Sequence, residues 1–485
     1  MKMKLLLLAM ASLALIFQLP LSAQADNGPE IKLRGVVEGF YGTPWNHAQR
    51  LDMLSFMASQ KLNAYIYAPK DDEFHRKFWR QPYPADKYQE LAELTQKAKK
   101  LNIDIIFAVS PGNDIDFNPP GCYDDRAAMV NKLMAMYDIG IRHFALFFDD
   151  IPTLNAKGQA EFVNWVNDNF VKTRPDIAPL ILVPTEYHLH QMAPNGQVTE
   201  YTKTMANSLQ DDIMVLYTGS EVCPDGLKLD TVRAVNQLYG KKMGIWWNYP
   251  VSDYMKEKLA LGPVDKLDKK LTNKDIFAFF INPMEKPELS KIAIATGADF
   301  ALNPADYDEK VAWDQAIQDQ YGQLADDMKL FANHSQRLEN NWAHIGRRDA
   351  PELRSMYFGL WKLVESKNTI PKLAMLDKLT ENNKTRARAI SRLLKNLPTK
   401  ALNEGKPQLE QLQRMTEAEK YALLILQDKT TKKQRTEWFA KFREIKEQIA
   451  ANESTAKISE ESLGKFINDF DGWYGAKSEE MNSND

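Results

Sequence analysis

Two adjacent aspartates, Asp149 and Asp150, are the residues most suited to chemistry. The apolar run Phe144–Phe148 leads directly into them, as expected for a buried strand that delivers acids at its end. Two neighbouring carboxylates resist ionising together, so the pKa of one tends to rise and a proton stays available near neutral pH. The alternative is that one acid caps a helix starting at Ile151 and Pro152 while the other faces water. The pair alone leaves both interpretations open.

The strand that carries these acids is one of a series. Short apolar runs, rich in β-branched or aromatic residues and too short for buried helices, recur between residues 34 and 282. They are Arg34–Gly39, Asn63–Tyr67, Asp104–Val109, His143–Phe148, Leu180–Val183, Ile213–Tyr217, Met243–Trp247 and Ile276–Ile281. Amphipathic stretches such as Lys87–Lys100 and Arg126–Tyr137 lie between them. We therefore expect an α/β fold in which eight parallel strands alternate with helices and close into a (β/α)8 barrel.

A doubly wound nucleotide-binding sheet is disfavoured, because the first strand ends in Gly39-Phe40-Tyr41-Gly42 and has no G-x-G-x-x-G loop. From about Trp313 onward the composition changes to Lys, Glu, Gln, Leu and Ala, with no expected strand, which predicts an all-α bundle. Four prolines should divide this bundle into four or five helices: Pro351, Pro371, Pro398 and Pro407. The predicted divisions are a signal peptide (1–25), the barrel (26–312), the bundle (313–477) and a disordered tail (478–485).

The first 25 residues have the pattern of a secretory signal peptide. Lys2 and Lys4 precede the apolar run Leu5–Phe17, and Ala23-Gln24-Ala25 resembles a cleavage site. An uncleaved membrane anchor is disfavoured because the run is shorter than the roughly 20 residues a span needs. We expect an exported protein, periplasmic or secreted, with no membrane anchor after cleavage.

The charge balance excludes some partners. Loss of Lys2 and Lys4 leaves 60 basic against 65 acidic residues, a net charge of −5, which gives no general attraction for nucleic acid or anionic membrane. Cys122 and Cys223 are expected in loops after strands; a disulfide between them is permitted but does not organise the fold. His188 and His190 have a metal-like spacing without a converging third ligand, so we expect no metal and no cofactor.

Active sites of such barrels lie at the carboxyl ends of the strands. Those ends carry carboxylates, amides, a lysine and aromatic rings, a set that suits a sugar, because rings cover its apolar faces while polar groups hold its hydroxyls. They include Gly39–Gly42, Pro69–Asp72, Ser110–Asp114, Thr185–Tyr187, Thr218-Gly219, Trp246–Pro250 with Asp253, and Asn282-Pro283. These neighbours favour a catalytic role for Asp149 and Asp150. Asp71 and Asp72 are a weaker candidate pair, because the adjacent Lys70 would keep Asp71 ionised.

The arrangement of acids indicates an unusual nucleophile. A retaining glycosidase ordinarily places a second carboxylate across the sugar ring. Here the seventh strand ends in Trp246-Trp247-Asn248, with no acid before Asp253. The simplest substitute is a 2-acetamido group of the substrate, which attacks C1 and gives an oxazoline. One aspartate would then polarise the acetamido N–H while its neighbour protonates the leaving oxygen.

These motifs, taken together, resemble the family 84 glycoside hydrolases, the O-GlcNAcase or hyaluronidase-like β-N-acetylglucosaminidases. The similarity covers residues 31 to 320 and, more loosely, the helical region. It rests on seven ordered segments: Arg34–Trp45, Ala68–Asp72, Phe147–Asp150, Pro184–Tyr187, Tyr217–Gly219, Trp246–Asp253 and Asn282–Glu285. The resemblance implies a retaining exo-β-N-acetylglucosaminidase that uses substrate-assisted catalysis.

The resemblance also implies residue roles. Asp149 would polarise the acetamido group and Asp150 would be the general acid and base. Tyr187 would hydrogen-bond the acetamido oxygen, and Asn248 would support the geometry of the acetamido group and the aspartate. The ring hydroxyls would be held by the Gly39 carbonyl, Lys70, Asp253 and Asn282, and the pocket would be shaped by Thr218, Trp246 and Tyr41. Val183 stands where family members often have a cysteine.

The competing class is a non-catalytic barrel that only binds N-acetylglucosamine. Loss of a strand-four acid or of Tyr187 would favour it, and neither is lost. A deacetylase would need a metal cluster, and a general hyaluronidase would need room for a continuing chain. The expected partner is a glycan or glycoconjugate containing N-acetylglucosamine; a modified protein, a chitin fragment and a cell-wall muropeptide remain open.

Overall fold

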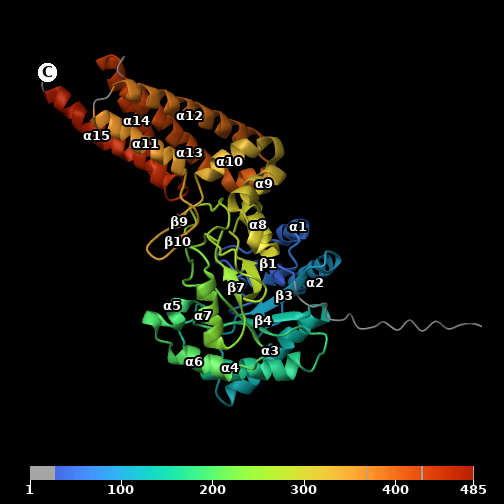
Figure 1. The fold of residues 1–485 in the computed structure, drawn as a ribbon. Helices are drawn as coiled ribbons and strands as arrows, with labels where there is room; N and C mark the ends of the chain where they lie inside the picture. The colour runs from blue at the N-terminus through green and yellow to red at the C-terminus, as the bar shows by residue number, and fades with distance from the viewer. Residues whose placement is uncertain (1–27, 367–368, 428–429, 484–485) are drawn as a thin grey trace, which may run out of the picture.

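The protein is described by a computed structural model over residues 28–366, 369–427 and 430–483. Its centre is a closed barrel in which every neighbouring pair of strands is parallel, and β8 pairs with β1 to complete the circle (Figure 1). This confirms the predicted fold class. The strands are β1 (Leu33–Glu38), β2 (Ala64–Tyr67), β3 (Asp104–Val109), β4 (His143–Phe147), β5 (Ile181–Val183), β6 (Met214–Tyr217), β7 (Met243–Trp247) and β8 (Ile276–Ile281). The predicted signal peptide, residues 1–25, lies outside the described residues.

The barrel strands form the core because both of their faces are covered. All residues of β7 and β8 are buried, and β2 and β5 are buried throughout as well. Side chains on one face fill the barrel, and those on the other pack against helices, which explains why these segments are continuous apolar runs without alternation. The observed strand bounds agree with the predicted ones within one residue at either end.

Helices surround most of the barrel: α1 (His47–Ser59), α2 (Ala85–Lys100), α3 (Gly121–Asp138), α4 (Ala156–Val166), α5 (Leu189–Met192), α6 (Glu200–Ser208), α7 (Leu229–Tyr239) and α8 (Pro287–Leu302). The predicted alternation fails once. Residues 248–275, all of which the structure describes, connect β7 to β8 without a helix. This connection contains Pro250 and Pro263, which interrupt helices, and it buries Leu259, Leu261 and Val264 against the barrel. Cys122 lies in the first turn of α3, not in a loop as predicted.

The region after the barrel is largely helical, as predicted. It contains α9 (Glu309–Tyr321), α10 (Ala325–Asn333), α11 (Pro351–Glu365), α12 (Thr369–Asn396), α13 (Thr399–Leu426), α14 (Lys432–Ala451) and α15 (Lys465–Ser483), with single turns of 3-10 helix at Pro194–Gly196, Pro304–Asp306 and Gly322–Leu324 and of π-helix at Asn167–Val171 and Glu460–Gly464. Figure 1 shows α11 to α15 as a bundle that extends from one side of the barrel, with α8, α9 and α10 between the two. Within the described residues, no helix combines the length and apolar character needed to cross a membrane.

Three sequence expectations for this region differ from the structure. Pro407 lies inside α13 and does not end it; the burial of Leu409, Leu412 and Met415 on the same helix outweighs the roughly 3 kcal/mol that an interior proline costs. The region is not free of strands, because β9 (Leu338–Glu339) and β10 (His344–Ile345) form a short antiparallel hairpin. The backbone of α15 is helical to Ser483, where a disordered tail was predicted from residue 478, since Glu and Met are good helix formers.

Barrel and bundle meet at the start of α8. This helix has no capping side chain of its own, because its N-cap residue is Lys286. Instead Glu404 of α13 accepts hydrogen bonds from the backbone N–H groups of Glu288 and Leu289, at 3.1 and 2.8 Å. A carboxylate of the bundle thus satisfies donors that a helix start leaves unpaired. Burial nevertheless raises the pKa of Glu404 to about 7, because the opposing backbone hydrogen bonds do not compensate for lost hydration.

Replacement of Glu404 by Gln should make stability less dependent on pH. With a pKa raised from 4.5 to about 7, the folded protein binds a proton that the unfolded chain has lost. The contribution to stability is therefore complete below about pH 4.5 and disappears as the pH rises through 7. Relative to wild type, Glu404→Gln should gain about 1–3 kcal/mol of unfolding free energy between pH 5 and pH 8, measured by urea denaturation.

The matched control is Glu417→Gln, an exposed glutamate on the same helix that pairs with Lys420 at 2.8 Å. Its difference from wild type should be the same at both pH values. An equal difference at pH 5 and pH 8 for Glu404→Gln would contradict the assignment.

Candidate active site

A cavity of about 320 Å³ opens at the carboxyl ends of the barrel strands. Its volume lies in the range of small-ligand sites. All the residues predicted for the site line this one cavity: Gly39, Tyr41, Lys70, Asp149, Asp150, Tyr187, Thr218, Trp246, Asn248, Asp253 and Asn282. They follow the ends of all the barrel strands except β3. Asn282, for example, comes directly after Ile281, the last residue of β8. The predicted set is thus brought together from positions up to 243 residues apart in the chain.

The two aspartates share the cavity because of the backbone at Asp150. Side chains of successive residues in an extended chain point to opposite sides. Asp150 has a φ of 56°, in the left-handed region that non-glycine residues seldom adopt. This conformation ends the alternation after β4, so both carboxylates line the same cavity. The helix-capping alternative is wrong, because Asn155 caps α4 through its side chain.

Asp149 is held by one of its two oxygens. Its Oδ2 accepts a short hydrogen bond from the ammonium of Lys70, and the two side chains are only 8% and 2% exposed. Its Oδ1 is buried and has no hydrogen-bond partner among the described residues. A buried acceptor without a partner is costly, so this oxygen is an acceptor prepared for a donor that enters the cavity. Lys70 therefore supports Asp149 and not Asp71, whose carboxylate accepts from the N–H of Gly42 at 2.8 Å.

Asp150 is held by two tyrosines. Tyr187 donates to its Oδ1 at 2.7 Å and Tyr41 donates to its Oδ2 at 2.9 Å. Burial acts to raise the pKa of Asp150, but the charge of Lys70 and the two hydroxyl hydrogen bonds outweigh it, with a further contribution from Arg76. The pKa of Asp150 therefore lies below its ordinary value. The adjacent acids predicted a raised pKa for one carboxyl of the pair. For Asp150 the structure shows the opposite direction.

Trp246 forms the floor of the cavity and is 5% exposed. Gly39 has to be glycine, because a Cβ at this position would lie 2.3 Å from the Trp246 ring. The Trp246 Nε1 donates to Oδ1 of Asn248 at 2.8 Å, and the amide nitrogen of the neighbouring Asn282 donates to the carbonyl of Val37 at 3.1 Å. Asn248 in turn donates to the carbonyl of Val222 at 2.9 Å. These bonds fix the orientation of the indole ring and of both amides.

Two further predicted residues are positioned by loop contacts. Asp253 accepts a hydrogen bond from the backbone N–H of Tyr41 at 2.7 Å, which ties the β7–β8 connection to the β1 loop. Burial raises the pKa of Asp253, opposed by the backbone hydrogen bonds of Tyr41 and Tyr254. The Thr218 hydroxyl donates to the carbonyl of Glu221 at 2.7 Å and so stabilises the loop after β6.

The cavity also contains residues that the sequence did not reveal as site residues. They are Tyr217, Val222, Cys223, Val251, Tyr254 and Trp342. Trp342 comes from the β9–β10 hairpin, 60 residues after Asn282 along the chain. It is 43% exposed and lies at the rim of the cavity. Val183, which stands where family members often have a cysteine, lines the cavity and is 3% exposed. Tyr217 is the last residue of β6, and this strand-end position could have indicated it. The other five lie in loops, and nothing in the sequence indicated them.

The cysteines and histidines considered as disulfide or metal candidates have other environments. Cys122 and Cys223 are both buried and free, so they do not form the disulfide that the sequence permitted. Burial raises the pKa of Cys223 to about 12, which makes its thiol a poor nucleophile. His188 caps α5 through Nδ1, which accepts from the N–H of Gln191. Among the described residues, no group of three or more His, Cys, Asp or Glu side chains has the arrangement of a metal site.

A parallel barrel with adjacent carboxylates, amides and aromatic rings at its strand ends is the arrangement of a barrel glycoside hydrolase. Two protein-family models match the chain. The one described as beta-N-acetylglucosaminidase matches residues 34–333, and the one described as hyaluronidase post-catalytic domain-like matches residues 352–467. The chain belongs to this β-N-acetylglucosaminidase family, family 84 of the glycoside hydrolases, as its motifs indicated.

Known relatives agree with this assignment. Protein O-GlcNAcase of Mus musculus is 32% identical over 279 residues, and that of Rattus norvegicus is 31% identical. The matched region is 56% of this chain and spans about 30% of the length of these relatives. The structure of CpGH84B is 36% identical with a TM-score of 0.86, covering 91% of this chain and 77% of that one. A Thermobaculum terrenum O-GlcNAc hydrolase mutant is 26% identical with a TM-score of 0.81, covering 91% and 94%.

Replacement of Tyr41 by Phe should raise the pKa of Asp150, because it removes a hydrogen bond that stabilises the carboxylate. The pKa can be followed by the carboxyl ¹³C shift in protein labelled at aspartate, with the resonance assigned from its loss in Asp150→Asn. Tyr217→Phe is the matched control, since Tyr217 lines the same cavity and its buried hydroxyl has no hydrogen-bond partner among the described residues. Identical titrations of wild type and Tyr41→Phe would contradict the prediction.

Proposed function

We propose that this protein is a retaining exo-β-N-acetylglucosaminidase that removes terminal β-linked N-acetylglucosamine through an oxazoline intermediate. The observation that carries the proposal is the state of Asp149. One of its oxygens is fixed by Lys70, and the other is a buried acceptor without a partner in the described structure, beside the second acid. Such an oxygen suits the N–H of a 2-acetamido group, which a sugar without that group could not supply.

The first step uses both aspartates. The acetamido oxygen attacks C1, the bond from C1 to the glycosidic oxygen breaks, and Asp150 gives its proton to the departing oxygen. Asp149 accepts the acetamido N–H and stabilises the positive charge of the oxazolinium ring. In the second step the Asp150 carboxylate takes a proton from water, the water oxygen attacks C1, and the ring opens to N-acetylglucosamine with its configuration retained.

Asp150 must carry a proton when the substrate is bound, although its pKa is low in the structure. Tyr187 offers a way to do this. Its single hydroxyl proton is donated to Asp150 at 2.7 Å, and the same proton cannot also be donated to an acetamido oxygen. If Tyr187 turns to the acetamido oxygen, Asp150 loses a hydrogen bond that lowers its pKa. Substrate binding would thus itself favour protonation of the acid.

The remaining residues would bind the sugar ring and shape the pocket around it. The Gly39 carbonyl, the free N–H groups of the Lys70 ammonium and the Asp253 carboxylate would hold ring hydroxyls, together with Asn282. Trp246 would cover an apolar face of the sugar. Tyr41, Thr218 and Asn248 would maintain the shape of the pocket through the contacts described above. Glu186 is a poor nucleophile here, because its carboxylate lies outside this cavity and accepts from Thr199 and Thr202.

We also propose that the protein is exported, from the signal-like pattern of residues 1–25, and that its partner is a glycan or glycoconjugate with terminal N-acetylglucosamine. The group attached to this sugar stays open among modified protein, chitin fragment and muropeptide. The alternative of a non-catalytic barrel is disfavoured because both acids, Lys70 and Tyr187 have the contacts that the proposed chemistry needs. Release of free N-acetylglucosamine from any of these three substrates would separate the two functions.

Fluorination of the acetamido methyl tests the nucleophile. Replacing one, two and three hydrogens by fluorine withdraws electrons at nearly constant shape, so the rate constant should fall steadily along the series. The slope should persist in Asp150→Ala, which keeps the attack, and should change in Asp149→Ala, which loses the group that stabilises the oxazolinium charge. A flat series in the wild type would instead identify an enzymic carboxylate as nucleophile, and Asp253 would be the first candidate because it lines the cavity.

Asp150→Ala tests the acid. A good leaving group such as 2,4-dinitrophenolate needs little protonation, whereas an alkoxide or a phenolate of high pKa needs much. The variant should therefore lose about 10²–10⁴-fold in kcat/KM on substrates with poor leaving groups and far less on activated aryl glycosides. Equal losses on both classes would show that Asp150 does not donate the proton.

A further inference from the structure

The rim of the cavity depends on a hairpin that cannot be stable alone. Trp342 lies between β9 and β10, and each of these strands has only two residues. Isolated two-stranded hairpins are marginal even when they are longer. Nevertheless the Trp342 ring packs on Tyr254, with ring centroids 4.7 Å apart and planes at 49°, and both rings line the cavity. Other contacts must therefore hold the hairpin in place.

The tip of the hairpin is a closed turn. The Asn340 side-chain oxygen accepts from the N–H groups of Trp342 and Ala343, at 2.9 and 2.7 Å. The N–H of Asn340 donates to the carbonyl of Ala343 at 3.0 Å. Trp342 is thus fixed relative to the hairpin, and its place in the cavity depends on how the hairpin is anchored to the barrel.

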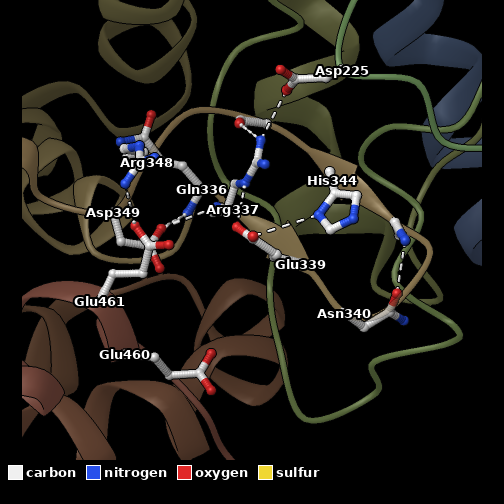
Figure 2. A network of polar contacts seen from close by, with 12 residues as sticks. Asp225, Gln336, Arg337, Glu339, Asn340, His344, Arg348, Asp349, Glu460 and Glu461 are labelled. Atoms are coloured by element: carbon white, nitrogen blue, oxygen red, sulfur yellow. Dashed lines mark hydrogen bonds and ion pairs between the residues drawn. The ribbon is translucent and has the colours of Figure 1, made fainter.

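Arg337 provides that anchor, as Figure 2 shows. Its Nε donates to Glu339 of β9 at 3.0 Å, and its Nη1 donates to the Gly346 carbonyl just after β10 at 2.8 Å. The same Nη1 contacts Oδ1 of Asp225 at 2.9 Å. Asp225 belongs to the barrel loop after β6, two residues beyond Cys223 of the cavity wall. One guanidinium therefore joins both ends of the hairpin to the loop that forms part of the sugar pocket.

The base of the hairpin is rigid. The carboxylate of Asp349 accepts from the N–H groups of Gln336 and Arg337, at 2.7 and 3.0 Å. The hydroxyl of Tyr249 donates to the Gln336 carbonyl at 2.9 Å. These bonds set the direction in which the chain enters the hairpin, but they do not reach its strands or the loop after β6. Only Arg337 makes that link among the contacts described above.

The guanidinium has the properties of an anchor. Exposed ion pairs stabilise little, and the carboxylate of Asp225 is 52% exposed. The side chain of Arg337, however, is only 13% exposed and meets three acceptors in one planar group. A planar fork of fixed donors loses little entropy for each bond it forms, which a lysine could not reproduce. Loss of Arg337 would leave the hairpin held by its base and by the buried side chains of Leu338, Ala343 and Ile345, without the polar link to the loop after β6.

We propose that Arg337 is a positioning residue: with Asp225 it clamps the hairpin so that Trp342 stays at the rim and contacts the group that leaves from the sugar. This inference rests on the proposed function. Trp246 on the floor is 5% exposed and faces the sugar pocket, whereas Trp342 is 43% exposed at its mouth. In an exo-acting enzyme the part of the substrate at the mouth is the leaving group. The clamp therefore sets affinity for the leaving group without touching the reacting atoms.

The test compares two ligands in full-length protein. The aryl substrate 4-nitrophenyl β-N-acetylglucosaminide reaches the rim with its ring, and the cyclised thiazoline of N-acetylglucosamine fills only the sugar pocket. Arg337→Ala should raise KM for the aryl substrate about three- to tenfold, the value of one aromatic contact, with kcat unchanged. Its inhibition constant for the thiazoline should stay at the wild-type value. Arg337→Lys should raise KM for the aryl substrate by a smaller factor than Arg337→Ala, because it keeps the positive charge but loses the planar set of guanidinium donors.

A double-mutant cycle separates positioning from general damage. Trp342→Ala should show the same rise in KM, and adding Arg337→Ala to it should change nothing further, because the clamp acts only through Trp342. Arg348→Ala is the matched control: this arginine lies in the same segment but is 62% exposed and contacts Glu461 of the bundle at 3.4 Å. It should leave KM and thiazoline binding unchanged.

Two sets of results overturn the inference. Additive effects of Arg337→Ala and Trp342→Ala, or an unchanged KM in Arg337→Ala, would show that Arg337 does not act through the rim. Weaker thiazoline binding by Arg337→Ala would show that it supports the sugar pocket itself. A wild type that neither hydrolyses the aryl substrate nor binds the thiazoline would instead overturn the proposed function, and the leaving-group role of the clamp with it.

Discussion

The contact between the Lys70 ammonium and the Asp149 carboxylate is the interaction on which the site depends. Both side chains are buried, and a buried charge is tolerated only when it is paired in good geometry. The pair fixes one oxygen of Asp149, leaves the other for a ligand, and places a positive charge close enough to lower the pKa of Asp150. The same cation thereby binds one acid and contributes to the lowered pKa of the other.

This pair exists only in the closed barrel. Lys70 follows β2 and Asp149 follows β4, so β3 lies between the strands that carry them. Their distance is fixed by the parallel register across β2, β3 and β4, in which Ile106 of β3 pairs with Ile66 on one side and His143 on the other. The packing of the barrel core therefore stabilises the ion pair. It holds together two charged groups that would separate in water.

The sequence sufficed for the barrel and for the strand-end residues, for a physical reason. Strands covered on both faces are continuous apolar runs, and in a parallel barrel their carboxyl ends all meet at one face. A position along the chain thus becomes a position in space without knowledge of any contact. Glu404, the hairpin and the left-handed φ of Asp150 do not follow such a rule, because each depends on contacts between distant segments.

The direction of the Asp150 pKa shows the same limit. The two adjacent acids predict mutual repulsion, which is a local effect that a sequence can show. The opposing effects come from Lys70, Tyr41 and Tyr187, each from the end of a different strand. With Arg76, their sum exceeds the effect of burial. Where several strand ends converge on one carboxyl, the sign of its pKa shift is a property of the assembled site and not of neighbouring residues.

The pocket therefore combines two kinds of structure with different constraints. Its floor, with Trp246 packed against Gly39 and the amides of Asn248 and Asn282, belongs to the barrel core, where any change in volume disturbs the strands. Its rim, with Trp342, belongs to a hairpin that buries Leu338, Ala343 and Ile345 in the core but leaves Trp342 43% exposed. A change at Trp342 therefore removes little core packing. In the proposed function, the sugar and the group attached to it are thus recognised by different parts of the structure, and the contact to the attached group can change at Trp342 with little effect on the fold.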